Sequence, residues 1–255
     1  MQKHKTLALF IGHGSPMNAI EDNEFSRGWA EIVRKIPKPK AILCISAHWE
    51  TQGAFVTAMD KPKTIHDFGG FPQALFDVQY NAPGSPELAR RITGLTGSKL
   101  NYDWGLDHGA WSVLLPMYPA ADIPVVQLSL DKAKSPLEHY ELAKKLAPLR
   151  DENVLIISSG DIVHNLRMFR FHAEKPYDWA ERFNNKIKEL IASNKHEEII
   201  NFQALGQDAA LAIPTQEHFL PLLYILALQE PGEQISFFND KVISSISMTS
   251  VFIGK

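Results

Sequence analysis

Residues 41–47 read Ala-Ile-Leu-Cys-Ile-Ser-Ala, and His48 follows directly. Nearly every position in this run is apolar, which is typical of a strand that is covered on both faces. Four other short runs share this character, at residues 6–11, 124–130, 154–159 and 247–253. Strands of this kind, separated by helical patterns, predict an α/β fold with a central, largely parallel or mixed sheet and helices on both of its faces.

Helical patterns fill the intervals between these strands. Residues 135–138, Ser-Pro-Leu-Glu, combine an N-cap serine, a proline at the first helical position and a glutamate at the third, and they predict a helix that ends near residue 149. The Pro- and Gly-rich residues 61–86 predict a long loop over the edge of the sheet. Because no linker or repeat interrupts the chain, we expect a single domain over residues 1–255. Three more helices are predicted, at residues 85–95, 177–192 and 215–228.

Three of the strands are followed within a few residues by a histidine: His13, His48 and His164. In an open α/β sheet, ligands bind beyond the carboxyl ends of the strands. The three imidazoles could meet there, although the first and the last are more than 100 residues apart. Imidazole is the commonest protein ligand for zinc, iron and copper, so we predict a metal centre at this edge. Each histidine alone would be interpreted as a packing or loop residue, and the hypothesis depends on the repeated placement.

The bulk composition excludes several classes of protein. The 255 residues are 45% apolar and 22% charged, with a net charge of −3, which argues against a nucleic-acid-binding protein. The apolar runs are too short to span a bilayer, and the N-terminus lacks the hydrophobic region of a signal peptide. The single cysteine, Cys44, is interpreted as a core residue, and a disulfide or a cysteine-based metal cage is excluded. We therefore expect a cytoplasmic protein without nucleic-acid or membrane partners.

Two other histidines lie in segments suited to substrate binding. His66 begins the stretch His-Asp-Phe-Gly-Gly-Phe-Pro, which predicts either a substrate-binding lip or an aromatic-anchored loop. His108, between Asp107 and a glycine, is a candidate acid–base or substrate-orienting group. Ser15, which follows the Gly-His-Gly motif of His13, is assigned with His66 to substrate binding. Four histidines in terminal, helical or charged contexts are predicted to lie on the surface: His4, His139, His172 and His196.

The fourth candidate ligand, His218, lies near the C-terminus. Thr215 is predicted to be a helix N-cap, which would place Glu217 and His218 in the first helical turn. A carboxylate there complements the helix dipole, whereas a cationic imidazole is unfavourable, and a neutral, metal-bound imidazole would resolve this conflict. The residues therefore predict a site of three or four histidines. Their chemistry does not choose between zinc, which activates water, and ferrous iron, which binds a bidentate substrate together with O₂.

Taken together, these motifs resemble the class III extradiol ring-cleavage dioxygenases, and among them the 4,5-DOPA dioxygenase branch. Each motif alone is weak, but six in this order are specific, and they cover essentially the whole chain. The resemblance implies a single catalytic domain that uses O₂ to open the ring of a catechol, such as L-DOPA, to a semialdehyde. The motifs lie at residues 12–16, 46–50, 66–72, 107–111, 158–164 and 217–221.

The resemblance also implies roles for the histidines. His13 and His48 match the family's first two metal ligands, and His218 matches the third, with Glu217 as the adjacent rival. His164 matches the active-site base, and it is also a candidate fourth ligand. One divalent ion per chain is implied, with Fe(II) expected for activity. Because imidazole-rich sites suit both metals, Zn(II) is a second candidate for the bound ion.

Within the same hypothesis, His66 and His108 would orient the diol or donate hydrogen bonds to developing oxyanions. The partners would be a small catechol and O₂, while the sequence does not indicate an oligomeric state. Two other functions also fit the pattern. One is a non-enzymatic binding protein similar to the Memo type, which would not consume O₂ with catechols. The other is a zinc-dependent hydrolase, which would act without O₂.

Overall fold

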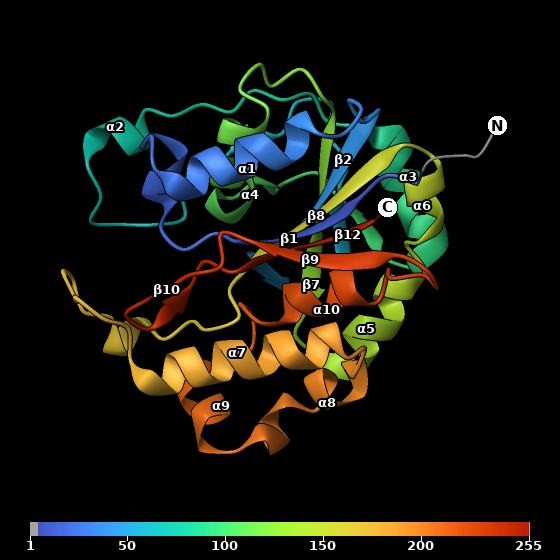
Figure 1. Cartoon of the computed structure of the whole chain (residues 1–255). Coiled ribbons are helices and arrows are strands. Elements are labelled where there is room, and N and C mark those ends of the chain that lie inside the picture. Colours follow the sequence, from blue (N-terminus) through green and yellow to red (C-terminus); the bar gives the residue numbers. More distant parts are fainter. Residues whose placement is uncertain (1–4, 255) are drawn as a thin grey trace.

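A computed structural model describes residues 5–254, in which helices cover both faces of an eight-stranded sheet (Figure 1). The strand order is β5-β3-β7-β2-β8-β1-β12-β9. The four central strands, β7, β2, β8 and β1, pair in parallel, whereas β12 and β9 on one side and β3 on the other are antiparallel to their inner neighbours. The sheet is therefore mixed, with a parallel centre. Its strands are β1 Ala8–Gly12, β2 Ala41–Thr51, β3 Phe55–Thr57, β5 Lys99–Asn101, β7 Val125–Asp131, β8 Val154–Gly160, β9 Gln234–Phe238 and β12 Ser250–Gly254.

Alternate residues of the central strands enter two hydrophobic cores, one on each face. In β2, Leu43 and Ile45 belong to one core, while Ile42 and Cys44 belong to the other. This two-sided burial explains why the strand sequences are continuously apolar. The helices α1 Glu24–Arg34 and α4 His108–Met117 cover the second core. The first is covered by α3 Pro86–Thr96, α5 Pro136–Lys144, α6 Pro148–Asp151, α7 Asp178–Ala192, α8 His196–Ile200, α9 Gln207–Ala212 and α10 Leu220–Leu226.

The remaining elements are short and lie in the connections. Residues 61–86 form a long loop, as predicted, that contains only β4 Lys63–Thr64 and α2 Gln73–Phe76 before α3 begins. The connection after β8 holds a short 3₁₀ helix, η2 Leu166–Met168. The others are β6 Gly105–Leu106, β10 Val242–Ile243, β11 Ile246–Ser247, η1 Pro16–Ala19 and η3 Phe202–Leu205.

The predicted capping box is present, but the helix that it begins is shorter than predicted. The Ser135 hydroxyl accepts from the Glu138 backbone N–H, and the Glu138 carboxylate accepts from the Ser135 backbone N–H. The helix α5 ends at Lys144 rather than near residue 149, and α6 begins separately at Pro148. A proline inside a continuous helix would remove one backbone hydrogen bond and clash with the preceding turn, so the chain bends before it.

The strand β2 is longer than predicted and irregular where His48 lies. It continues to Thr51, but its register with β7 shifts between Ile45 and Glu50. Its pairing with β8 ends at Ser46. A shift of this kind kinks a strand and changes the direction in which its side chains point. The irregularity therefore lies at the carboxyl end of the parallel centre, where His48 leaves the sheet.

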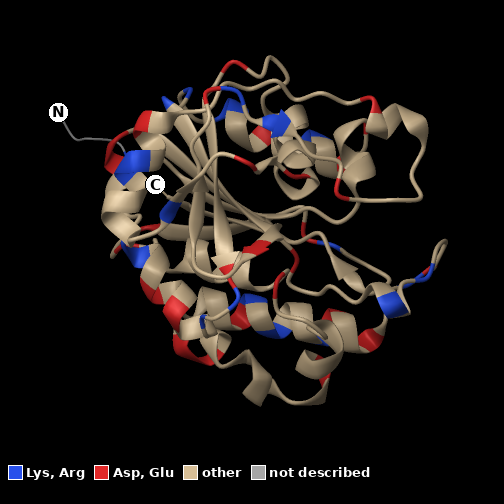
Figure 2. Cartoon of the chain, turned by 180° about the vertical axis from the view of Figure 1, so that it is seen from behind, with Lys and Arg blue, Asp and Glu red and all other residues tan. Residues whose placement is uncertain are grey.

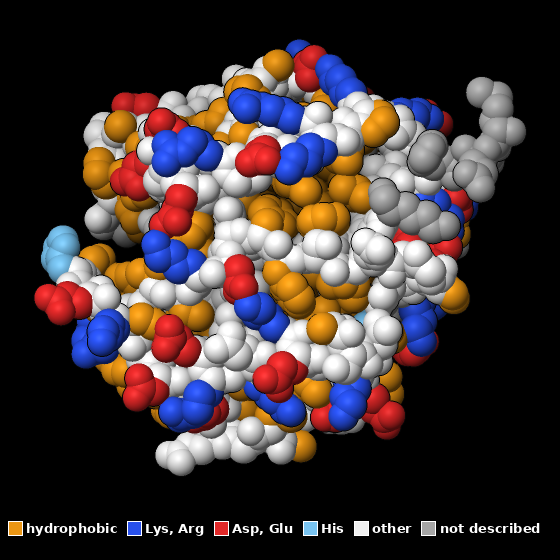
Figure 3. Space-filling view, in the orientation of Figure 1, with side chains coloured by type: hydrophobic (Ala, Val, Ile, Leu, Met, Phe, Trp, Pro, Cys, Tyr) orange, Lys and Arg blue, Asp and Glu red, His pale blue; other side chains and the backbone are white. Residues whose placement is uncertain are grey.

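The surface carries charges of both signs. Lysine and arginine residues are interspersed with aspartate and glutamate along the outer helices (Figure 2). On the face of Figure 1, apolar side chains gather near the middle of the molecule, with charged groups around them (Figure 3). Among residues 5–254, no helix has both the length and the apolar character needed to cross a membrane.

Candidate metal centre

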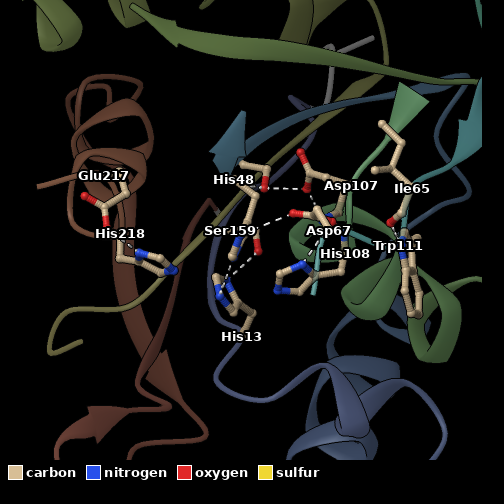
Figure 4. A network of polar contacts seen from close by, with 12 residues as sticks. His13, His48, Ile65, Asp67, Asp107, His108, Trp111, Ser159, Glu217 and His218 are labelled. Atoms are coloured by element: carbon tan, nitrogen blue, oxygen red, sulfur yellow. Dashed lines mark hydrogen bonds and ion pairs between the residues drawn. The ribbon is translucent and has the colours of Figure 1, made fainter. Parts of the chain in front are cut away.

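Three histidines from separate parts of the chain converge beyond the carboxyl ends of the parallel strands. His13 follows β1, His48 lies in the irregular part of β2, and His218 precedes α10. One ring nitrogen from each lies within 4.8 Å of those of the other two. The Nε2 atoms of His13 and His48 are 3.4 Å apart. Figure 4 shows the outer nitrogen of His218 pointing toward His13. The three rings thus surround one point in space.

Each of these rings has a second contact at its other nitrogen, Nδ1. An imidazole held in this way presents Nε2 as a lone-pair donor, which is the usual arrangement of metal-ligating histidines. The Nε2 atom of His218 is buried and has no hydrogen-bond partner in the described part of the chain. These residues therefore fit a divalent metal. The Nδ1 contacts are Ser159 Oγ at 2.9 Å for His13, Asp67 Oδ2 at 3.4 Å for His48 and Glu217 Oε1 at 3.0 Å for His218.

Burial keeps these imidazoles neutral. Burial, and then the neighbouring imidazoles, lowers the pKa of His13 and of His218 well below the usual range. The pKa of His48 is lowered to about 3, again mainly by burial. Metals bind the neutral form of histidine, so protons compete weakly for this site near pH 7.

His164 lies beside these three rings rather than among them. Its ring stacks on that of His218, with centroids 3.5 Å apart and an interplanar angle of 5°. It belongs to a second possible metal-binding group, with Asp161 and His218. Burial lowers the pKa of His164 to about 4, so the imidazole is neutral at pH 7 and can accept a proton. This geometry suits a base next to the centre, and it also allows a fourth ligand.

Asp161 is a buried carboxyl group at the same centre, and sequence reasoning gave it no role. Its Oδ1 accepts a hydrogen bond from the Gly14 backbone N–H at 3.1 Å. Its Oδ2 lies 3.7 Å from His13 Nε2 and is without a hydrogen-bond partner among residues 5–254. Burial raises the pKa of this carboxyl well above its usual range. A metal next to His13 would favour the ionised form.

His108 and Asp67 form the opposite side of the centre. Asp67 Oδ1 accepts from the His108 backbone N–H at 2.9 Å and lies 3.0 Å from His108 Nδ1. Burial opposes ionisation of Asp67, but the contacts with His108 and His48 outweigh it and hold the pKa of this carboxyl below its usual range. The carboxylate therefore orients both rings, whose centroids are 3.8 Å apart. The adjacent residue must be small, because a Cβ at Gly109 would lie 2.7 Å from His48.

These side chains line a cavity of about 650 Å³ with largely apolar walls. His13, His48, His108, His164 and His218 form its polar end. Ser15 lies on the lining and is exposed to solvent. The apolar part consists of Pro16, Phe68, Phe71, Leu166, Phe169, Phe171 and Ile246. Phe68 and Phe71 belong to the stretch interpreted from the sequence as a possible substrate-binding lip. Sequence reasoning missed the other walls, because scattered apolar residues in loops carry no periodic signal.

His66, assigned from the sequence to substrate binding, lies away from the cavity. It is not among the residues that line the cavity, and its Nε2 lies 2.9 Å from the carbonyl oxygen of Val78. Its ring packs near Phe68 and Trp111. The neighbouring Asp67 faces the cavity instead. The His-Asp pair was visible in the sequence, but which of the two side chains points inward depends on how the loop packs.

The geometry around Glu217 also differs from the prediction. The helix predicted from residue 215 begins at Leu220, and the Thr215 hydroxyl donates to Glu217 Oε1 rather than capping the helix. Glu217 is not part of any possible metal-binding group in the described chain, whereas His218 is. The Glu217 carboxylate contacts the ring of His218, so Glu217 supports a candidate ligand rather than being one.

The prediction of a surface position was wrong for His139. This residue is 1% exposed, and its Nδ1 lies 2.9 Å from the Tyr224 hydroxyl. His172 is exposed as predicted, and His196 is half-buried with its Nδ1 2.9 Å from the Tyr140 hydroxyl. His4 lies outside the described residues.

Comparisons with known proteins agree on one family. Residues 4–250 match the family described as the catalytic LigB subunit of aromatic ring-opening dioxygenase. The 4,5-DOPA dioxygenase extradiol of Escherichia coli K12 is 46% identical over 263 residues, which cover 100% of this chain and 97% of that protein. The protein of the same name from Beta vulgaris is 45% identical over 223 residues, which cover 84% of this chain and 83% of that protein.

A solved structure has the same fold. The crystal structure of an uncharacterized protein from Escherichia coli K12 superposes with a TM-score of 0.85 at 41% sequence identity. The match covers 98% of this chain and 100% of that one. The architecture described above is therefore that of a known protein over practically its full length.

Proposed function

This chain belongs to the LigB family of aromatic ring-opening dioxygenases. We propose that it uses O₂ to cleave the ring of a catechol such as L-DOPA by 4,5-extradiol cleavage, which yields a semialdehyde. The resemblance predicted from the sequence motifs is thus confirmed at the level of the family and of the enzyme class. A non-enzymatic binding role and hydrolysis have no comparable support. We propose that residues 1–255 act as one catalytic domain.

The observation that supports this proposal best is the convergence of three neutral imidazoles at the end of an apolar cavity. The cavity volume of about 650 Å³ accommodates a substituted aromatic ring. Its polar end carries five histidines, while aromatic side chains form its walls. A catechol would fit with its diol toward the histidines and its ring against the phenylalanines.

The metal would be held by His13, His48 and His218, and the family is metal-dependent. When bound, such a metal would lower the pKa of the catechol hydroxyl groups and bring the diol close to O₂. Fe(II) is the ion proposed for activity, and Zn(II) is a competitor for the same imidazoles. Ser159, Asp67 and Glu217 would hold the Nδ1 sides of the three rings, so that their Nε2 atoms stay in place.

His164 would take a proton from the diol. Its ring is neutral at pH 7, lines the cavity and stacks on a proposed ligand, His218. A general base in this position contributes roughly 10²–10⁴ in rate. His108, held by Asp67, would orient the diol from the opposite side. The apolar walls would exclude water, which strengthens these polar contacts.

The test is anaerobic reconstitution with Fe(II), followed by measurement of O₂ uptake and visible absorbance with a panel of catechols that includes L-DOPA. We expect a yellow product formed with one O₂ consumed per ring opened. Protein loaded with Zn(II) is the matched control, and it should bind catechols without consuming O₂. Absence of O₂ uptake by iron-loaded protein with every catechol would overturn the proposal.

A further inference from the structure

The cavity that would hold the catechol ring offers no cation to a charged substituent. Its lining in the described chain contains neither lysine nor arginine. Its carboxylate, Asp67, is engaged by His108 and His48. A substituent with a carboxylate would lose its hydration against the phenylalanine walls without gaining a counter-ion, and that is unfavourable. An anionic group on the substrate must therefore leave this cavity.

A second hollow, of about 320 Å³, adjoins the first. The two share His164, Leu166 and His218 in their linings. A ligand whose ring lies at the metal centre can extend past these shared residues into the second hollow. Its lining includes a polar side chain, Thr215, and two charged ones, Arg167 and Glu217.

Arg167 supplies the cation that the main cavity lacks. It lies in η2 directly after Leu166, one of the residues shared by the two hollows. A guanidinium group binds a carboxylate through two parallel hydrogen bonds, which gives it geometric specificity as well as charge. This arginine is thus placed to receive a carboxylate that emerges from the main cavity.

Glu217 supplies the opposite charge in the same hollow. Its Oε1 accepts from the Thr215 hydroxyl at 2.8 Å and lies 3.0 Å from His218 Nδ1. Both contacts use Oε1, so Oε2 can accept a hydrogen bond from an ammonium group. A cation and a carboxylate around one small hollow are complementary to a zwitterion.

We propose that Arg167 and Glu217 form a subsite for the α-amino-acid group of the substrate, with the carboxylate on Arg167 and the ammonium on Glu217. This inference rests on the proposed function and names the residues that would bind the amino-acid tail of a substrate such as L-DOPA. A tail with only one of the two charges would leave the other side chain of the subsite without a partner. The subsite therefore selects for both charges together.

The experiment compares four catechols with different tails on iron-loaded protein: L-DOPA, 3,4-dihydroxyphenylpropanoate, dopamine and 4-methylcatechol. In the variant Arg167→Gln, kcat/KM for L-DOPA and for the propanoate should fall about tenfold, mainly through KM, because an exposed charge-assisted pair contributes modestly. Dopamine and 4-methylcatechol lack the carboxylate, so their values should stay within about twofold of the wild-type values. Equal losses for all four substrates, or no loss for L-DOPA, would overturn the subsite.

The matched control is Arg170→Gln in the same connection. The Arg170 guanidinium lies 4.0 Å from the centre of the Tyr177 ring, and this residue lines neither hollow. Its substitution should leave the ranking of the four substrates unchanged. A shift in that ranking equal to the shift for Arg167→Gln would count against a specific contact.

A binding measurement separates this inference from the proposed function. Calorimetry of zinc-loaded protein without oxygen should show about tenfold weaker binding of L-DOPA to Arg167→Gln than to the wild type, with 4-methylcatechol unaffected. If iron-loaded protein consumes no O₂ but this difference is found, the proposed reaction fails while the subsite stands. If O₂ uptake is normal and the difference is absent, the subsite fails and the reaction stands.

Discussion

His139 and His218 are alike in nearly every local property, yet they belong to different parts of the molecule. They are 1% and 7% exposed, and burial lowers the pKa of both, to about 4 for His139. Each has its Nδ1 against an oxygen, of Tyr224 or of Glu217, and an Nε2 without a hydrogen-bond partner among the described residues.

The difference is what lies beyond Nε2. His218 faces two other imidazoles at the end of a cavity. His139 lies in α5, faces Tyr224 of α10 and belongs to no possible metal-binding group in residues 5–254. Burial, a shifted pKa and a free nitrogen therefore do not define a metal centre. The convergence of several such groups does.

The largest effect should come from removing a proposed ligand. In His13→Ala, the metal content should fall to background and ring cleavage should be lost, because two imidazoles are left where three converged. Metal analysis and O₂ uptake would check this. His139→Ala is the control, and it should keep one metal ion per chain. A His13→Ala protein that retains its metal and activity would contradict the assignment.

The next effect should separate a base from a ligand. His164→Gln should lower turnover roughly 10²–10⁴-fold with the metal retained, because His13, His48 and His218 converge without it and its ring stacks on that of His218. Turnover and metal content are measured on the same sample. Loss of the metal together with activity would instead make His164 a fourth ligand.

The metal centre and the core around His139 should both make the stability of the protein depend on pH. The pKa values of His139 and His164 are about 6.5 in the unfolded chain and about 4 in the folded one. As the pH falls, these groups are therefore protonated at a higher pH in the unfolded chain than in the folded one. The free energy of unfolding is therefore highest above pH 6.5, and each group lowers it by about 3 kcal/mol as the pH falls toward 4.

Urea unfolding of metal-free protein between pH 7 and pH 4 would measure this loss. His139→Ala and His164→Gln should each make the dependence shallower by about one proton. A dependence as steep as that of the wild type in both variants would show that other groups control acid unfolding.

The smallest effect should come from substituting the core histidine, His139, and measuring stability at neutral pH. His139→Ala should lower the free energy of unfolding by about 2–3 kcal/mol, because it leaves a cavity and an unsatisfied Tyr224 hydroxyl. Its metal content and turnover should match the wild type. Tyr224→Phe, which removes only the hydroxyl, should cost about 1 kcal/mol. A loss of metal in either variant would contradict the distinction between the core around His139 and the metal centre around His218.

Local sequence signals predicted most of the fold. The five apolar runs became strands of one sheet because burial on both faces leaves a continuous apolar pattern. Ser135 caps a helix as predicted, and Ser85 caps the helix predicted at residues 85–95, since a cap depends only on the next three residues. The misplaced helix ends lie near prolines, at Pro148 and Pro221, where local propensity and packing compete.

The sequence around His139 contains a pattern that indicates a buried position for this residue. Leu142 and Ala143, three and four residues further on, are both buried on the side of α5 that packs toward α10. Residues at these spacings share one face of a helix, so His139 belongs to the buried face despite its charged neighbours in the sequence.

The sequence by itself determined the family and the placement of histidines after strands, because both are properties of residue order. Only the tertiary structure decided that Ser159, Asp67 and Glu217 contact the Nδ1 atoms, and that Asp67 rather than His66 faces the cavity. It also decided that Arg167 borders a hollow shared with His218. The physical reason is that most of these contacts join strands and loops that are far apart in the sequence and meet only when both cores are packed. No local pattern of residues encodes the direction in which such a side chain points.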